Sequence, residues 1–248
     1  MAEVGLELYT VRDETGRDFA GTVRKVAALG YPAVEFAGYG DLSAEEMRDL
    51  LAETGMRAAA THVGLAALEA DFDREIDYCR TIGCSNLILP WLPLEQRSPD
   101  FLAALAPRLN EFGRRARAAG ITFGYHNHDF EFVLEGGQSL LARLLDATDP
   151  ELVTLELDVY WAAHAGSDPI ELLRHYAGRV PVIHLKDMDS ERRYTEVGDG
   201  TLKIKEIVTA AVDGGTSWLI VEHDAPTLPS LESAKRSLEN LRALGIAG

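Results

Sequence analysis

The segment Thr122-Phe123-Gly124-Tyr125-His126-Asn127-His128 begins as a short apolar strand and ends in two imidazoles. The same arrangement recurs three times further along the chain, where a strand-like stretch ends in an acid or a histidine. These stretches are Val153–Tyr160 with Asp158, Val180–Lys186 with His184, and Trp218–His223 with Glu222. Two carboxylates and two imidazoles brought together would bind a divalent cation, so the question is whether one fold can gather them.

Short apolar stretches and helix-period segments alternate along the whole chain. Ser43 and Glu46 form a capping box at the start of one helical segment, and Pro107 predicts a kink or a break in the helix expected over 100–119. The 248 residues therefore contain eight strand-helix rounds of about 31 residues, the size of one βα unit. The other four strand candidates are Val4–Val11, Ala33–Ala37, Ala58–His62 and Asn86–Pro90.

Eight consecutive rounds predict an α/β protein, a single (β/α)8 TIM barrel that takes up residues 1–248. Length alone allows one or two domains, but no Pro/Gly/Ser-rich linker and no sequence repeat divides the chain. A doubly wound open sheet is the alternative, and such sheets usually have a glycine-rich loop after the first strand. That position reads Tyr9-Thr10-Val11-Arg12-Asp13, without glycine. The sequence also lacks a P-loop and a G-x-S-x-G elbow, which argues against phosphoryl transfer from nucleotides and serine hydrolase chemistry.

The charge balance excludes several partners. The chain carries 24 Lys and Arg against 40 Asp and Glu, a net charge of −16. This charge repels phosphate backbones and anionic membranes, so we expect a small-molecule ligand and neither nucleic acid nor a membrane as partner. The segment Met1–Gly5 lacks the features of a signal peptide, and no apolar run approaches the ~20 residues of a membrane span, which predicts a cytoplasmic location. A homo-oligomer is left open.

A closed barrel would bring the four strand ends together, because functional residues of (β/α)8 barrels collect at the carboxyl ends of the strands. Neighbouring strands lie ~4.8 Å apart, so side chains from four consecutive ends can reach one ion. Nitrogen and oxygen ligands without thiolate fit Mn²⁺, our first expectation, and also Mg²⁺, Co²⁺, Fe²⁺ or Zn²⁺. A single histidine or acid here is more often a core hydrogen bond or a helix cap, so the prediction depends on the whole set. The predicted ligands are His126, Asp158, His184 and Glu222.

Several side chains at this mouth are candidates for catalysis. A divalent ion beside a keto sugar would acidify the proton next to the carbonyl, and Glu222 is placed to remove that proton. Lys186 would stabilise the enediolate oxygen, although a salt bridge with Asp187 or Glu156 is an equal alternative. Side-chain alternation puts Glu156 one layer deeper than Asp158, as a partner of the ligands.

The second proton donor and the substrate contacts are expected from other strand ends and loops. The candidate donors are His126 and His128. Three of the substrate-binding candidates have a structural alternative: a hydrogen bond for the imidazole, packing for the aromatic ring and pairing with Asp13 for the guanidinium. These candidates are His62, Glu35, Trp161 and Arg12, of which Arg12 would hold a carboxylate or phosphate.

Together these segments resemble the xylose isomerase-like TIM-barrel superfamily over nearly the whole chain. The superfamily includes sugar and sugar-phosphate isomerases and epimerases, inosose dehydratases and the endonuclease IV branch. The motifs are specific to the superfamily and do not identify a substrate. They are Leu8-Tyr9-Thr10-Val11-Arg12-Asp13, Thr61-His62-Val63-Gly64, the run from Tyr125 to Phe132, Leu157-Asp158-Val159-Tyr160-Trp161, His184-Leu185-Lys186-Asp187 and Val221-Glu222.

The resemblance implies a divalent-metal-dependent isomerase or epimerase that acts on a keto sugar or related polyol through an enediolate. The ketose 3-epimerase branch implies a metal shell of Glu, Asp, His and Glu, and Asp158, His184 and Glu222 match the last three positions. His126 stands where that branch has its first glutamate, which moves the chain toward the Tyr-His-x-His pattern of inosose dehydratases. A metal-dependent dehydratase or lyase and a sugar-binding barrel without turnover are the alternatives. The negative charge disfavours an endonuclease.

Overall fold

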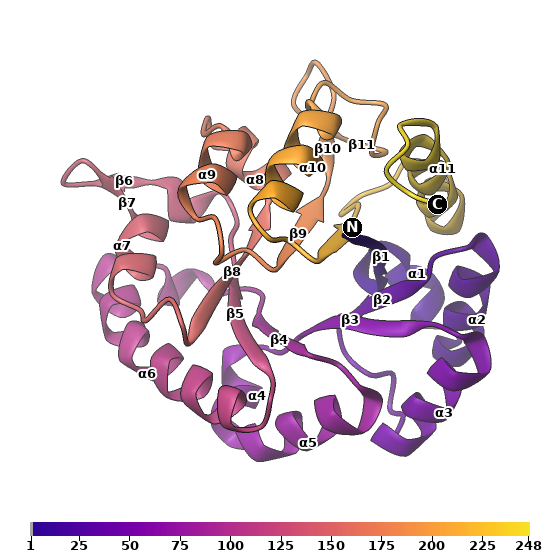
Figure 1. Ribbon diagram of the computed structural model, residues 1–248, viewed down its shortest axis with the longest axis horizontal. Coiled ribbons are helices and arrows are strands. Elements are labelled where there is room, and N and C mark those ends of the chain that lie inside the picture. The colour runs from indigo at the N-terminus through magenta and orange to yellow at the C-terminus, as the bar shows by residue number, and fades with distance from the viewer. Residues whose placement is uncertain (1) are drawn as a thin grey trace.

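The computed structural model of the protein describes residues 2–248, which form a closed barrel of eight parallel strands with helices around it (Figure 1). Strands that follow one another in the sequence are neighbours in the barrel, and β1 pairs with β12 to close it. The predicted (β/α)8 barrel is confirmed. Its strands are β1 (Glu3–Glu7), β2 (Ala33–Phe36), β3 (Arg57–His62), β4 (Asn86–Leu89), β5 (Thr122–His126), β8 (Val153–Asp158), β9 (Val182–Leu185) and β12 (Trp218–Val221).

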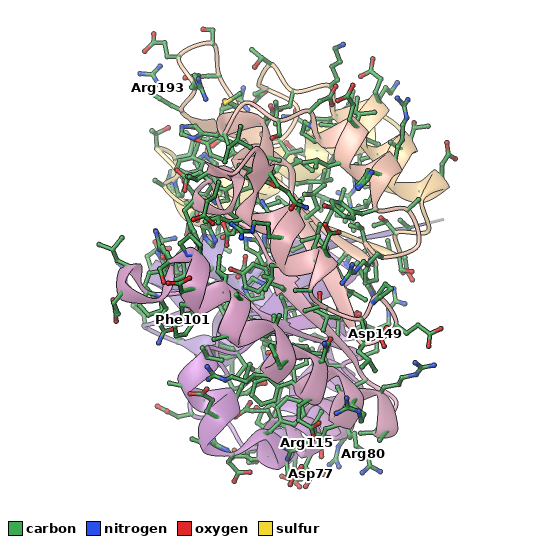
Figure 2. The ribbon with its side chains drawn as sticks, turned by 90° about the vertical axis from the view of Figure 1, so that its left-hand side faces the viewer. Asp77, Arg80, Phe101, Arg115, Asp149 and Arg193 are labelled. Atoms are coloured by element: carbon green, nitrogen blue, oxygen red, sulfur yellow. The ribbon has the colours of Figure 1, made fainter. Side chains whose placement is uncertain are left out.

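The helices pack with their apolar faces against the outside of the barrel and keep their charged faces in solvent. Figure 2 shows this for Asp77 and Arg80 of α5, whose side chains lie at the outer surface of the molecule. The helices are α1 (Arg12–Thr15), α2 (Phe19–Leu29), α3 (Ala44–Thr54), α4 (Leu65–Ala70), α5 (Phe72–Ile82), α6 (Pro99–Ala118), α7 (Leu140–Asp146), α8 (Val159–His164), α9 (Pro169–His175), α10 (Ile204–Asp213) and α11 (Ser230–Ala243).

Shorter elements lie in the loops. Figure 1 shows two small hairpins that project from the barrel. One is β6 (Leu134–Glu135) with β7 (Gln138–Ser139), and the other is β10 (Asp187–Met188) with β11 (Tyr194–Thr195). Three 3₁₀ turns follow barrel strands: η1 (Leu8–Val11), η2 (Leu94–Gln96) and η3 (Phe130–Phe132). Within residues 2–248 no helix has the length and apolar character needed to cross a bilayer.

The inside of the barrel has an apolar layer below a polar one. Ala33, Ala59, Val182 and Ile220 form a separate buried cluster. Space in this layer is tight, since a Cβ on Gly5 would lie 2.8 Å from Cδ1 of Ile220. Because side chains alternate along a strand, the next inward position towards the carboxyl end is polar on several strands. Acids and histidines therefore form the next layer of side chains, between this apolar layer and the carboxyl end of the barrel.

Two expected strands end earlier than predicted, and of the two alternatives at Pro107, a kink or a break, the break is not found. The first strand ends at Glu7 and not at Val11, because Leu8–Val11 turns into a 3₁₀ helix whose apolar side chains are buried outside the barrel. The strand predicted over Val153–Tyr160 ends at Asp158, which caps α8 by accepting a hydrogen bond from the Trp161 amide at 2.9 Å. A break at Pro107 is absent from α6, which continues because its buried apolar stripe spans both sides of the proline. The capping box of α3 is confirmed.

A candidate metal centre at the barrel mouth

Inward-facing acids and histidines meet at the carboxyl end of the barrel. They border a cavity of about 520 Å³, whose walls include His126, His128, Lys186 and Glu222. His126 and His128 come from the end of β5 and the loop after it, Lys186 follows β9 and Glu222 follows β12, as the expected barrel mouth requires. The structure therefore brings the predicted catalytic residues together around one cavity.

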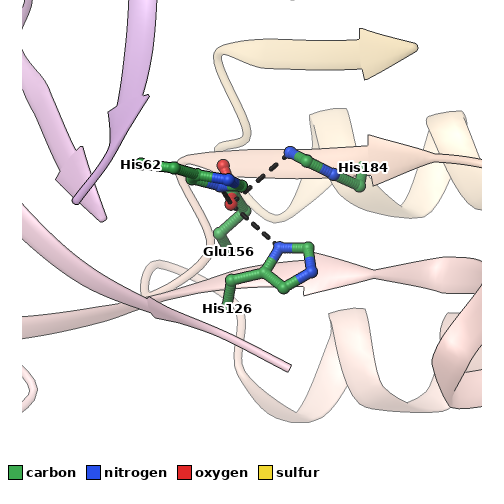
Figure 3. A group of neighbouring side chains, drawn as sticks. All are labelled: His62, His126, Glu156 and His184. Atoms are coloured by element: carbon green, nitrogen blue, oxygen red, sulfur yellow. Dashed lines mark hydrogen bonds and ion pairs between the residues drawn. The ribbon is translucent and has the colours of Figure 1, made fainter. Parts of the chain in front are cut away.

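Four of these residues have ligand atoms within 4.8 Å of one another: His62, His126, Glu156 and His184. The Glu156 carboxylate is the centre of this group (Figure 3). Its Oε2 lies 2.6 Å from Nε2 of His62, 2.9 Å from Nδ1 of His126 and 3.5 Å from Nε2 of His184. Glu156 was expected behind the ligands, whereas the structure places it among the groups that could hold a metal.

A second group shares His184 with the first. Glu7, His184 and Glu222 also have ligand atoms within 4.8 Å of one another. Nδ1 of His184 lies 2.7 Å from Oε2 of Glu222 and 3.4 Å from Oε2 of Glu7. The other ring nitrogen, Nε2, lies 3.0 Å from Oε2 of Glu35. His184 therefore stands between two sets of carboxylates, both fully or almost fully buried.

Asp158, the fourth predicted ligand, lies at the edge of these groups and belongs to neither. Its Oδ2 is 3.8 Å from Nε2 of His126 and 3.1 Å from the Lys186 ammonium. The ammonium also lies 2.7 Å from Glu222 and 2.8 Å from Asp224. Lys186 thus pairs with these three carboxylates and not with Asp187 or Glu156, which corrects the expected alternative. The Asp187 carboxylate accepts backbone hydrogen bonds instead.

Burial and charge push the four mouth histidines in opposite directions. Burial disfavours the charged form of His184, but Glu156, Glu35 and Glu7 outweigh it and raise the pKa of His184 well above its usual value. His62 has a raised pKa for the same reasons. Burial lowers the pKa of His126 well below its usual value despite the Glu156 hydrogen bond, and burial with the Lys186 charge lowers the pKa of His128 to about 3. His126 and His128 are therefore neutral imidazoles, the form that binds metal ions.

The carboxylates of the site outnumber its permanent cations. Glu7, Glu35, Glu156, Asp158 and Glu222 are all at most 5% exposed, and Lys186 is the buried lysine beside them. Oε1 of Glu156 and Nδ1 of His128 are buried without a hydrogen-bond partner among the described residues. Buried charge requires compensation, and buried polar atoms without partners are uncommon away from functional sites. A divalent ion fits this donor set of nitrogens and carboxylate oxygens, provided that its binding displaces the protons of His62 and His184.

The predicted substrate-binding residues divide into two kinds. His62 lines the cavity, and Glu35 lies beneath it against His184. The Trp161 ring centroid is 5.5 Å from that of His128 and 5.8 Å from the Lys186 ammonium, so it covers one side of the site. Arg12 instead donates hydrogen bonds to the carbonyls of Tyr9 and Asp224.

The alternative account of Arg12, pairing with Asp13, is not what the structure shows. Asp13 accepts a hydrogen bond from the Ser230 hydroxyl at 2.6 Å. The sequence analysis also missed Glu7 and Asp224 as members of the site. A signal for Glu7 was present, because an acid inside an otherwise apolar strand is an uncommon choice for a core position.

Residues 23–244 match the model of the xylose isomerase-like TIM-barrel family. The chain belongs to this family. An inosose dehydratase from Mesomycoplasma hyopneumoniae is 34% identical over 164 residues, which cover 56% of this chain and 53% of that enzyme, so the chain spans about half the length of this curated relative. An inosose dehydratase from Geobacillus kaustophilus is 26% identical over 240 residues, 80% of this chain and 77% of that enzyme.

Among solved structures, a sugar phosphate isomerase/epimerase from Parabacteroides distasonis superimposes with a TM-score of 0.86. It is 24% identical, and the match covers 100% of this chain and 96% of that one. At this identity the likeness supports the fold and leaves the reaction open. The two curated relatives are thus named as inosose dehydratases, and the structural neighbour as a sugar phosphate isomerase/epimerase.

Proposed function

We propose that this chain is a divalent-metal-dependent isomerase or epimerase acting on a keto sugar or related polyol. The observation that carries the proposal is the position of the Glu222 carboxylate, whose Oε2 lies 2.7 Å from both Nδ1 of His184 and the Lys186 ammonium, inside the cavity. A base placed between a candidate ligand and a fixed cation suits removal of a proton next to a carbonyl.

The metal would be held by His184 with Glu7 and Glu222, or by His184 with His62, His126 and Glu156, and Asp158 is the further candidate. When bound, it would polarise the substrate carbonyl and acidify the neighbouring C–H bond. Oxygen and nitrogen donors without thiolate favour Mn²⁺ or a similar ion. These assignments follow from the residues that the structure brings together at the mouth.

The side chains themselves perform the proton transfer. Glu222 removes the proton, and Lys186 stabilises the negative oxygen of the enediolate. Burial opposes the charge of Lys186, but Asp158, Glu222 and Asp224 raise its pKa well above the usual value, so it acts as a fixed positive charge. His128 is neutral and contributes a hydrogen bond to a substrate oxygen, in the way that a neutral imidazole polarises a carbonyl.

The second candidate is a dehydratase or lyase, in which the same enediolate loses a substituent from the next carbon. Two observations favour it: position 126 is a histidine, and the curated relatives reported above are named inosose dehydratases. Both reactions begin with the same proton removal. They differ in whether the product has lost water.

The test is hydrogen exchange at the substrate carbon. The protein is stripped with a chelator, reloaded with Mn²⁺, Mg²⁺, Co²⁺ or Zn²⁺, and incubated in D₂O with a panel of keto sugars and inososes. We expect metal-dependent deuterium incorporation that Glu222→Gln abolishes and the exposed control Glu206→Gln retains. Exchange that persists after metal removal, or that survives Glu222→Gln, would refute the mechanism. The product mass separates isomerisation from loss of water, and ligand binding without exchange would support a non-catalytic barrel.

A further inference from the structure

Two exposed aromatic rings lie at the rim of the cavity. Tyr9 is 41% exposed and Trp91 is 47% exposed, and both line the cavity. Among residues 2–248, no other Phe, Tyr or Trp side chain is exposed, so the exposed aromatic side chains of this part of the chain are found at one site. Exposed aromatic side chains gathered at a cavity are typical of binding surfaces rather than of ordinary protein surface.

Both rings are held in place by a guanidinium group. Arg12 lies over the Tyr9 ring at 4.1 Å from its centroid, and its Nη1 donates to the Tyr9 carbonyl at 2.8 Å. Arg97 lies 5.2 Å from the Trp91 ring centroid, and its Nε donates to the Leu92 carbonyl at 2.8 Å. Fixed rings lose little conformational freedom when a ligand binds to them, which favours a role as binding platforms.

Small residues line the cavity between these rings. Tyr9 follows β1 and Trp91 follows β4, and strands β2 and β3 stand between them in the barrel. The cavity wall after β2 consists of Ala37 and Gly38, both exposed, and no atom lies within 4 Å of where a Cβ on Gly38 would be. Of the candidate metal ligands, Glu7 and His62 come from β1 and β3 on this side, and the others come from β5, β8, β9 and β12 on the other side. A notch lined by small residues therefore opens at β2, with an aromatic ring on each side.

The cavity is larger than one sugar ring. A hexose has twelve non-hydrogen atoms, and even at the roughly 30 Å³ that each water molecule takes up in the liquid, they would fill only about 360 Å³. The cavity volume of about 520 Å³ leaves space for a further group.

The site is unsuited to a phosphate group. Lys186 is the one Lys or Arg among the described residues that line the cavity, and its ammonium is already paired with three carboxylates. Glu7, Glu222 and Asp224 add negative charge to the same walls. A phosphate dianion against these walls would meet like charge. The guanidinium groups of Arg12 and Arg97 lie against the two rim rings, outside these walls, and already donate to backbone carbonyls.

We propose that the substrate is an uncharged keto sugar that carries a second ring, and that this ring binds in the notch between Tyr9 and Trp91. The inference rests on the proposed function, because the first ring is the keto sugar at the metal-capable residues. The second ring is recognised through its apolar face by stacking, which a pyranose and an arene can both satisfy. The inference differs from the names of related structures in excluding sugar phosphates.

The test compares four derivatives of one keto hexose: the free sugar, a disaccharide, an aryl glycoside and a phosphate ester. We expect kcat/KM for deuterium exchange to be at least tenfold higher for the two-ring compounds than for the free sugar, and lowest for the phosphate ester. The preference between disaccharide and aryl glycoside identifies the second ring. Equal values for free sugar and both glycosides, or a preference for the phosphate, would overturn the inference while leaving proton removal intact.

Variants of the notch locate the second ring. Ala37→Trp fills the notch and Trp91→Ala removes one platform, so each should lower the ratio of two-ring to one-ring kcat/KM at least tenfold. Leu94→Ala, at a neighbouring side chain that is 79% exposed, is the matched control and should keep the ratio. A ratio that neither variant lowers refutes the binding position.

If no compound exchanges with any metal, the proposed function fails, and calorimetry then decides the inference separately. Tighter binding of the two-ring compounds that Ala37→Trp abolishes would support it. Equal binding of one-ring and two-ring compounds would overturn it.

Discussion

Replacing Lys186 with Met should destabilise the protein strongly. The Lys186 side chain is 2% exposed, and its ammonium lies within 3.1 Å of the carboxylates of Asp158, Glu222 and Asp224. Methionine has a similar length and fills the space, so the change removes the charge and little packing. Removal of one partner from a buried ion pair costs about 3–5 kcal/mol, because the remaining charge stays buried without compensation. We therefore expect a loss of about 4 kcal/mol of unfolding free energy near pH 8.

The assay is urea unfolding of the chelator-treated protein, followed by circular dichroism, with Lys205→Met as the control at an exposed lysine. The control should change stability by no more than about 0.5 kcal/mol. Burial raises the pKa of Asp158 to about 6 even with Lys186 beside it, so removing that cation raises it further. A carboxyl whose pKa is raised on folding stabilises below its unfolded pKa and loses that effect as the pH rises through its folded pKa. The loss should thus be smaller at pH 5 than at pH 8, and a variant as stable as the wild type at pH 8 would refute this account.

Three further predictions concern the surrounding fold. Burial raises the pKa of Glu131 to about 7. The unfolding free energy should therefore fall by about 3 kcal/mol as the pH rises from ~4.5 to ~7, because the buried carboxyl loses its proton over that range. Glu131→Gln should flatten the pH profile of urea unfolding in that window. Asp187→Asn replaces one of two oxygens that each accept two backbone N–H bonds, so it should cost about 2 kcal/mol and speed amide exchange at Gly198 and Gly200. A Cβ at Gly113 would overlap the Leu152 carbonyl, so Gly113→Ala should lower the unfolding free energy by about 1–3 kcal/mol in the same urea assay.

The barrel could be predicted from the sequence because its signals are local and repeated. Each round carries an apolar stretch and a helix with its own start and stop residues, and the order of the rounds alone gives the order of the strands. The ends of the first and sixth predicted strands could not be fixed in this way. Leu8, Val11 and Val159 are buried in helical turns, and an apolar side chain signals burial equally in a strand and in a turn.

The site was predictable in place but not in detail. Strand ends identified His126, His184 and Glu222 at one mouth, as the fold places them. The choice of Asp158 over Glu156 as the acid nearest the imidazoles depends on strand register and side-chain rotamers, which the sequence does not specify. In the barrel, His126 is the register partner of Glu156, whereas the Asp158 side chain caps α8 and contacts Lys186.

The histidine at position 126 therefore has a different consequence for the carboxylates of the site in the structure than the sequence motif suggests. By sequence it replaces the first glutamate of the ketose 3-epimerase pattern and removes a carboxylate from the site. In the barrel a carboxylate is present on the adjacent strand, because Oε2 of Glu156 lies 2.9 Å from Nδ1 of His126, and Glu7 supplies another across the mouth. A site that retains an acid on each side of its histidines has the groups needed for either reprotonation or elimination. The histidine at position 126 alone does not decide between epimerase and dehydratase chemistry. We expect the reaction to depend on which carbon of the bound sugar faces Glu222.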